Sequence, residues 1–254
     1  MVEKEDSALA EQGKRDPQNH RTVDRVTRIL EEVVYHPGMT FGELVRVLDY
    51  PKSSVHGFVQ GLLAKGWLYE DRNRFYLGPA IYGLTLASGH VRADFVTYAD
   101  LLALHEATGL AVFLGVQAGD HLIYIAEAGI DPVEGFAART NIRRTLLMTA
   151  AGKALLAEQA DADRLSYLRR RGAAEREMVD HFLGEIEEIR TTRIATNRIN
   201  KRFAISTCVR NLAGTAVAAV TLVGAEQTVK PNVEELSKTL LKAVGAWSKR
   251  SGGR

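Results

Sequence analysis

The sequence of 254 residues lacks several features that would place it in a class at once. Its only cysteine, Cys208, excludes an internal disulfide framework and fits a reducing compartment. No apolar run reaches about 18 residues, so we expect no membrane-spanning helix. The first 20 residues are charged and polar, without the hydrophobic core of a signal peptide. Together these absences predict a cytoplasmic protein.

The sequence also lacks an excess of charge of either sign. Its 33 Lys and Arg against 31 Asp and Glu give a formal net charge of +2. Residues 21–78 hold eight basic and seven acidic side chains. Total charge therefore does not indicate a nucleic-acid binder, and any DNA contact must depend on where the cations lie.

Signatures of catalysis are missing as well. The stretch TLLMTAAGKA has a superficial likeness to a phosphate-binding loop, but Leu147 stands where the first glycine belongs and Ala154 where Ser or Thr belongs. No G-x-S-x-G motif occurs. The seven histidines are scattered, and one cysteine cannot build a thiolate zinc cage. We therefore expect no enzyme, no metal and no cofactor.

The composition that is present fits a folded chain of one or two domains. An apolar fraction of 46% with 25% charged residues is typical of globular proteins. Residues 1–20 have no apolar period and are expected to be a disordered tail. Beyond it we predict a DNA-binding domain over 21–78, a linker helix over 79–91 and a second domain over 92–250.

Three helices are predicted at the start of the first domain. Apolar residues recur at helical spacing over 22–35. A second helix follows, with Thr40 as its N-cap and Glu43 completing a capping box. Pro51 fits the first turn of a third helix, where its missing N–H costs nothing, and Gly66 ends that helix.

The third helix has the character of a DNA recognition helix. Its first turn carries short hydroxyls and cations opposite an apolar stripe, which suits insertion into a major groove. The expected DNA-binding residues here are Lys52, Ser53, Ser54 and His56. Two alternatives stay open: either serine could instead cap the helix, and the histidine could be a solvated surface residue.

A hairpin follows the three helices, which makes the domain a winged helix-turn-helix. Two strands, 67–69 and 75–77, are expected around the polar turn 70–74. Arg72 and Arg74 in that turn are candidate contacts to the DNA backbone or minor groove. The alternative is an ordinary solvated hairpin tip.

After a short apolar helix over 79–89, a linker or dimer contact, the chain alternates strands and helices in the pattern of an α+β domain with a mainly antiparallel sheet. Strands are expected at 110–117, 122–128, 135–138, 203–210 and 215–223. Helices are expected at 92–108, 149–157, 162–170, 179–190 and 232–247. Asn232 is the expected cap of the last helix, with Glu235 in the capping-box position, and 139–146 is interpreted as an irregular basic loop.

Two features of the second domain suggest a ligand site. The helix beginning at Thr149 presents free N–H groups suited to a carboxylate, although small residues there could simply allow close packing. A basic run could also serve an acid, although a solvated face is the favoured interpretation. The run comprises Arg190, Arg193, Arg198, Lys201 and Arg202.

Four stretches in this order resemble the IclR family of bacterial transcription regulators. They are LDYPKSSVHGFVQGLLAKGWL, FYLGPAIYGL, MTAAGKALLA and FAISTCVRNLAGTAVAAVTLVG. The resemblance extends from about Arg21 to the final helix. It implies a winged helix-turn-helix, a C-terminal effector-binding domain of GAF-like fold, homodimers or homotetramers, and binding to palindromic double-stranded DNA.

The resemblance also implies an effector pocket for a small organic or aromatic acid. Matching the family's pocket to this chain points to Thr149, Ala150, Ala151, Asn197, Ala204 and Thr221, with Leu146 and Met148 as added apolar walls. The chain departs from the family at Gly57, where an arginine is frequent, and near Asn197, where an acidic pair and a glycine are usual.

These observations predict a transcriptional regulator, repressor or activator, controlled by a small metabolite. Two alternatives remain at this point. One is a metabolite-processing enzyme with an attached winged domain, and the other is a constitutive DNA-binding protein whose pocket has decayed.

Overall fold

The computed structural model describes residues 20–88, 96–129 and 143–250. The chain divides into two compact units, Met1–Ile81 and Tyr82–Arg254. The expected tail over 1–20 lies outside the described residues except for His20, and the expected strand at 135–138 lies outside them altogether. Within the described chain, no helix combines the length and apolar character needed to cross a membrane.

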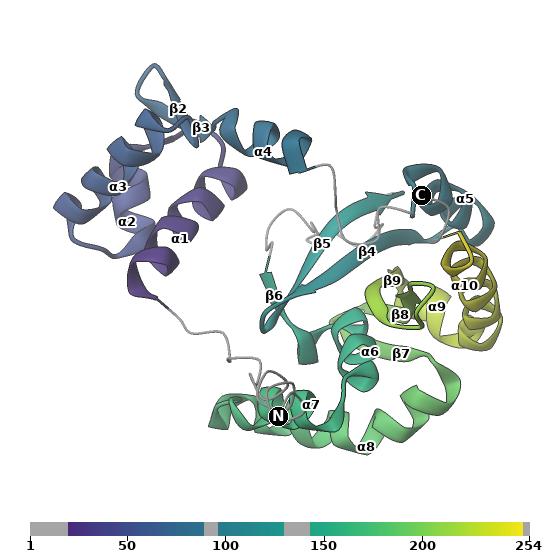
Figure 1. Ribbon diagram of the computed structural model, residues 1–254. Helices are drawn as coiled ribbons and strands as arrows, with labels where there is room; N and C mark the ends of the chain where they lie inside the picture. Colours follow the sequence, from purple (N-terminus) through teal and green to yellow (C-terminus); the bar gives the residue numbers. More distant parts are fainter. Residues whose placement is uncertain (1–19, 89–95, 130–142, 251–254) are drawn as a thin grey trace, which may run out of the picture. The chain divides into compact units, whose positions relative to one another are not determined.

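The first unit begins with three helices around one small core (Figure 1). They are α1 (Arg21–Tyr35), α2 (Phe41–Leu48) and α3 (Lys52–Ala64). Thr40 and Glu43 form the predicted capping box at the start of α2. Asp49 then adopts a left-handed conformation that ends α2. One apolar face of each helix packs inward, with Ile29, Leu44 and Val55 fully buried.

A small sheet completes this unit as the wing. Strands β1 (Met39–Thr40), β3 (Arg74–Leu77) and β2 (Leu68–Asp71) pair antiparallel in that order. The expected five-residue turn is wrong, because only Arg72 and Asn73 form the turn. Both have positive φ, as a tight hairpin turn of the primed type requires. Strand β1 has only two residues and gave no sequence signal.

The predicted linker helix corresponds to α4 (Ala80–Ser88), and the next helix, α5 (Tyr98–Thr108), begins later than expected. Thr97 caps α5 through a second capping box with Asp100, which sets its start. Gly109 then ends the helix in a left-handed conformation.

The second unit is built on a six-stranded antiparallel sheet with strand order β6-β5-β4-β9-β8-β7. The strands are β4 (Ala111–Ala118), β5 (His121–Ala128), β6 (Arg143–Thr145), β7 (Ala195–Ile199), β8 (Arg202–Arg210) and β9 (Ala216–Ala225). The two long hairpins predicted from sequence supply the four central strands. The mixture of helices with an antiparallel sheet confirms the predicted α+β class.

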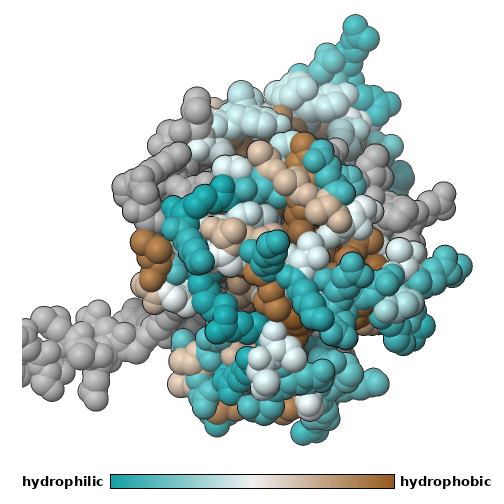
Figure 2. Space-filling model, turned by 90° about the vertical axis from the view of Figure 1, so that its right-hand side faces the viewer, coloured by the Kyte–Doolittle hydropathy of each residue, from teal (hydrophilic) through white to brown (hydrophobic). Residues whose placement is uncertain are grey.

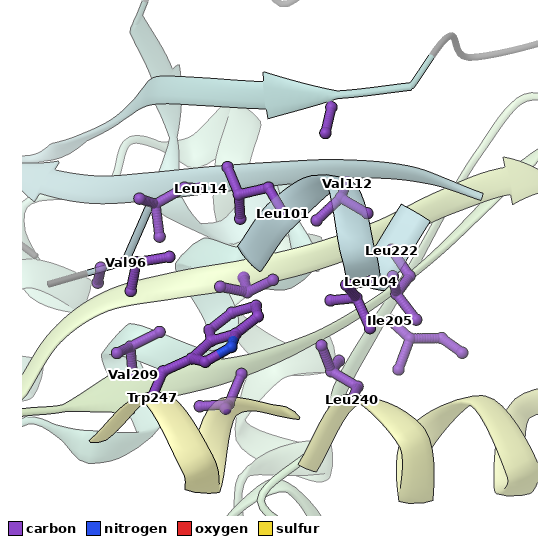
Figure 3. Close-up of a cluster of buried hydrophobic side chains, with 14 of the residues drawn as sticks. Val96, Leu101, Leu104, Val112, Leu114, Ile205, Val209, Leu222, Leu240 and Trp247 are labelled. Atoms are coloured by element: carbon purple, nitrogen blue, oxygen red, sulfur yellow. The ribbon is translucent and has the colours of Figure 1, made fainter. Parts of the chain in front are cut away.

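One face of this sheet is covered by α5 and α10 (Val233–Ser248), which lie side by side (Figure 1). Alternate residues of the central strands point into this layer, as the two-residue strand period requires. Figure 3 shows Trp247 of α10 reaching the sheet among Val209, Leu114 and Leu240. On the side shown in Figure 2, hydrophilic side chains predominate, with hydrophobic ones between them.

The opposite face carries a second apolar core beneath three helices. They are α6 (Ala150–Glu158), α7 (Asp161–Arg169) and α8 (Arg176–Thr192). A short 3-10 turn, η2 (Leu146–Met148), leads into α6. Phe182 and Ile186 of α8 and Leu156 of α6 belong to this core. The ligand site described below lies on this side of the sheet.

Three expectations for the second unit are corrected. Residues 143–145 form β6 rather than an irregular loop, because their backbone pairs with β5 at the sheet edge. The basic stretch after α8 forms β7, which pairs with β8. Asn232 does not cap α10: its side-chain amide donates to the Thr228 carbonyl (2.8 Å), because α9 (Glu226–Val229) and η4 (Lys230–Asn232) lead into α10.

Candidate DNA-binding surface and ligand cavity

The outward face of α3 carries most of the predicted DNA-binding residues. Lys52, Ser53 and His56 are exposed, and Ser54 is half-buried. Val55 and Val59 anchor the opposite face in the core. The first turn of α3 therefore presents one cation, two hydroxyls and an imidazole on a helix whose orientation is fixed by its buried side.

Neither serine caps α3, so the capping alternative is wrong. Pro51 is the N-cap residue and makes no side-chain bond to the helix. Its carbonyl accepts from the backbone N–H groups of Ser54 (2.9 Å) and Val55 (3.1 Å). The Ser53 and Ser54 hydroxyls consequently remain outside the local capping pattern, and the first N–H groups of α3 face outward without a side-chain acceptor.

The rest of the α3 surface is compatible with a polyanion. No residue of α3 is acidic. Gln60 lies one turn beyond His56 and is exposed, an addition that the sequence motif did not single out. The His56 ring stands edge-on to Phe41 of α2, with 5.9 Å between the ring centroids. That contact fixes the imidazole against the neighbouring helix.

The two arginines of the wing have different surroundings. Arg72 occupies the turn itself and is exposed. Arg74 donates from Nη1 to the carbonyl of Gly38 (2.7 Å) and so ties β3 to the segment before β1. Glu70 and Asp71, both exposed, offset the two positive charges locally. The geometry therefore leaves Arg72 as the wing cation at the hairpin tip and gives Arg74 a structural contact.

A cavity of about 180 Å³ opens on the second unit beside the start of α6. Its walls come from five strands and from the beginning of that helix. They are Tyr124, Arg144, Thr149, Ala150, Asn197, Ile199, Asn200, Arg202, Ala204 and Val223. Thr149, Ala150, Asn197 and Ala204 were predicted for an effector pocket, so the structure brings these four together.

The cavity is positively charged. Arg144 and Arg202 line it, and none of the lining side chains that the structure describes is a carboxylate. Arg144 lies over the Tyr124 ring, with its Cζ 6.0 Å from the ring centroid. Arg202 is only 8% exposed, so its assignment to a solvated face is wrong. Since Arg202 opens β8 and pairs with Ala225, its side chain is held on the cavity side.

The start of α6 is fixed by hydrogen bonds within the cavity wall. Thr149 Oγ1 accepts from the Gly152 backbone N–H (2.9 Å) and caps the helix. Asn197 Nδ2 donates to the Met148 carbonyl (2.8 Å), which joins β7 to η2. Ala150 is the first helical residue, and its N–H has no carbonyl acceptor within the helix.

Gly152 and Lys153 explain the middle of the MTAAGKALLA stretch. A Cβ on Gly152 would lie 2.1 Å from the Leu146 carbonyl oxygen, so only glycine lets α6 approach η2 this closely. The Lys153 side chain is 3% exposed and donates to Glu185 of α8 (2.7 Å). These two residues hold the helix in the core rather than contribute to the cavity.

The remaining predicted pocket residues are not in the cavity wall. Leu146 and Ala151 are fully buried in the core beneath α6. Met148 is half exposed, and its backbone carbonyl is engaged by Asn197. Thr221 lies behind Tyr124 in the sheet. The family pattern therefore located the region correctly, but burial separates these four from the walls.

Sequence reasoning missed several lining residues because each depends on strand register. Tyr124, Ile199, Asn200 and Val223 come from different strands or turns, without a shared motif. One signal was available: in β9 the two-residue period places Val223 on the same side as Thr221. The cation at Arg144 was hidden in a segment interpreted as a loop.

A row of hydroxyls lies behind the cavity. Ser206 Oγ donates to the Val220 carbonyl (2.8 Å), and Thr221 Oγ1 donates to Ser206 Oγ (3.0 Å). Tyr124 shares a hydrogen bond with Thr221. Burial raises the pKa of Tyr124 to about 12, against the opposing effects of the Arg144 charge and that hydrogen bond. Tyr124 is therefore protonated at neutral pH.

Nothing in the described residues points to catalysis. No group of three or more His, Cys, Asp or Glu residues there is arranged to hold a metal ion. Burial raises the pKa of the Cys208 thiol well above its ordinary range, so this thiol is not a nucleophile at neutral pH.

The fold and the site together define a class of protein. A winged helix-turn-helix with an outward recognition helix belongs to DNA-binding proteins. A separate sheet unit with a polar, charged cavity is a typical small-molecule site. The combination is that of a two-domain, ligand-responsive DNA-binding regulator.

Comparison with known families identifies the lineage. Residues 22–72 match the IclR helix-turn-helix domain, and residues 85–249 match the bacterial transcriptional regulator IclR C-terminal domain. The chain belongs to the IclR family of bacterial transcriptional regulators. The family predicted from the four sequence stretches is thereby confirmed.

Individual relatives are more distant. The HTH-type transcriptional regulator BhcR of Paracoccus denitrificans is 29% identical over 161 residues, which cover 62% of this chain and 57% of BhcR. An IclR transcriptional regulator from Alicyclobacillus acidocaldarius has a TM-score of 0.72 at 19% identity, covering 92% of this chain and 100% of the other. An IclR homologue from Microbacterium hydrocarbonoxydans, in complex with 4-hydroxybenzoate, has a TM-score of 0.74 at 17% identity with the same coverage. At these identities the two structures establish a shared fold.

Proposed function

We propose that this chain binds operator DNA through α3 and the wing, and that a small organic acid in the cavity of the second unit controls that binding. The observation that carries the proposal is the pairing of an outward recognition helix without acidic residues with a cavity lined by two arginines and no described carboxylate.

Operator binding is assigned to the outward side of the first unit. Lys52 and Arg72 neutralise phosphates, while Ser53, Ser54 and His56 reach phosphates or base edges. Arg74 positions the wing through Gly38 and contributes charge nearby. Because the first unit has almost no net charge, these few groups must supply the specific contacts.

The working form is a homodimer or homotetramer acting on a palindromic site in the cytoplasm. A dimer places two recognition helices in successive major grooves, about 34 Å apart, so that each reads one half-site. The exposed apolar side chains of α4, Tyr82 and Leu84, suit a contact between two copies.

The second unit is a GAF-like sensor in this proposal. Arg144 and Arg202 attract an acid, and the N–H groups at the start of α6 add positive potential. The complex of a homologue with 4-hydroxybenzoate supports a small acid as the ligand class. The acid shifts the population between two arrangements of the regulator by binding one of them better.

Two measurements test the proposal together. Labelled promoter DNA is titrated with the full chain, with and without a panel of small acids, and thermal unfolding is recorded with the same panel. We expect a sequence-specific shift that an acid changes, and stabilisation of the chain by that acid. Absence of a specific shift under every condition would remove the DNA assignment. Absence of stabilisation by any acid would favour a constitutive DNA-binding protein.

A further inference from the structure

The hydrogen bonds behind the cavity have a fixed direction. The Val220 carbonyl can only accept, so the Ser206 hydroxyl must use its proton there (2.8 Å). Thr221 then has to donate to Ser206 (3.0 Å), because the Ser206 proton is already committed. The Thr221 oxygen is thereby left as an acceptor toward its other neighbour, Tyr124.

Tyr124 inherits this polarity. It can share a hydrogen bond with Thr221 only by donating its own proton, since the Thr221 proton is used elsewhere. The Tyr124 oxygen retains lone pairs, and Tyr124 lines the cavity. On this side the cavity therefore offers a ligand an acceptor and no donor.

The rest of the wall has the opposite character. The guanidinium groups of Arg144 and Arg202 are donors that cannot accept and cannot lose their charge. They suit a carboxylate. They also disfavour a second positive charge in the same small space, so the group facing Tyr124 should be a neutral donor rather than an ammonium.

Resting on the proposed effector function, we propose that the cavity selects small hydroxy acids, with the carboxylate toward the arginines and the hydroxyl donating to Tyr124. Thr221 acts as the positioning residue that sets the polarity of Tyr124 without touching the ligand. The cavity volume of about 180 Å³ limits the ligand to roughly one ring or a short chain, since an apolar cavity of about 150 Å³ holds benzene.

Isothermal titration of the full chain with matched acids tests this inference. One series is lactate, pyruvate and propionate, in which the 2-position carries a donor, only an acceptor, or neither. A second series is benzoate and its three monohydroxy derivatives. In each series we expect the best hydroxy acid to bind about tenfold more tightly than its analogue without a donor, as one added hydrogen bond predicts.

Two variants connect that preference to the proposed atoms. Tyr124→Phe removes the acceptor and should reduce the tenfold preference to about one. Thr221→Val frees the Tyr124 proton to face the cavity, so pyruvate should gain on lactate although no wall residue has changed. Thr207→Val is the matched control: it removes a buried hydroxyl of β8 that donates to the Arg193 carbonyl, away from the cavity, and should retain the wild-type preference.

The outcomes separate the two proposals. Acids that bind without any donor preference, or with a preference that survives both Tyr124→Phe and Thr221→Val, would overturn the hydroxy-acid inference and leave the acid pocket standing. Failure of every acid in both series to bind the wild-type chain at millimolar concentration would overturn the pocket itself. Unchanged thermal unfolding of the variants without ligand shows that each change acts on binding and not on folding.

Discussion

Helices α3 and α6 both begin at a surface proposed to bind a ligand, but they meet it in different ways. In α3 only one side is buried, through Val55, Val59 and Leu62. In α6 every residue from Ala150 to Ala157 is buried, because the sheet, α8 and η2 surround it. A helix packed on one side can present its first turn to a partner as large as DNA, whereas a helix packed all round can only border a cavity.

The glycines of the two helices should show the largest difference. Gly152→Ala places a Cβ 2.1 Å from the Leu146 carbonyl oxygen, and backbone cannot move aside cheaply, so we expect a loss of about 3 kcal/mol. Gly57→Ala meets nothing within 4 Å on exposed α3 and should instead stabilise the first unit by about 1 kcal/mol.

Urea unfolding can measure both glycine effects, because the two tryptophans lie in different units. Trp247 reports the second unit in a Trp67→Phe background, and Trp67 reports the first in a Trp247→Phe background. A Gly152→Ala chain as stable as its parent would show that α6 is not held against η2 as closely as described.

The lysines in the two helices provide the next contrast. Lys153 is buried against Glu185, whereas Lys52 is exposed. Glu185→Ala leaves the Lys153 ammonium buried without its carboxylate, which should cost about 3 kcal/mol in the Trp247 transition. The matched control is Glu234→Ala, which removes an exposed pair with Lys238 and should leave the unfolding midpoint unchanged. Equal effects of the two substitutions would contradict the buried assignment.

Lys52→Ala should affect DNA and not folding. Loss of one phosphate contact should weaken operator binding and reduce the slope of log K against log salt by about 0.9. Fluorescence anisotropy across a salt series measures both quantities. Lys65→Ala, at the other end of the same helix, removes an equally exposed cation and should leave the slope near its wild-type value. Identical slopes for Lys52→Ala and wild type would mean that the first turn of α3 does not contact DNA.

Elements with strong local signals were predictable from the sequence. Helices α1, α2 and α3 followed from apolar period and turn residues, and Thr40 with Glu43 marked the start of α2 correctly. The short edge strands β6 and β7 were missed because cations and polar residues dominate them, and only pairing with β5 and β8 makes them strands. Local composition does not contain that information.

The cavity was only partly predictable for a related reason. Thr149 and Asn197 were found because they lie in stretches that resemble a family pattern. Tyr124, Arg144 and Arg202 are far apart in sequence and meet only when strand register fixes which side each faces. The charge of the site, and hence its ligand class, depends on those long-range pairings.

Hydroxyls at the two helix starts give the smallest and most selective test. Thr149→Ala removes the oxygen that accepts from the Gly152 N–H and should cost about 1 kcal/mol in the Trp247 transition. Thr149→Ser keeps that oxygen and should recover most of the loss. Ser53→Ala in α3 removes no capping bond, so the Trp67 transition should not move while operator affinity falls. A destabilised Ser53→Ala chain would show that α3 relies on its first-turn hydroxyls for folding, and would remove the distinction between a helix start that faces a partner and one built into the core.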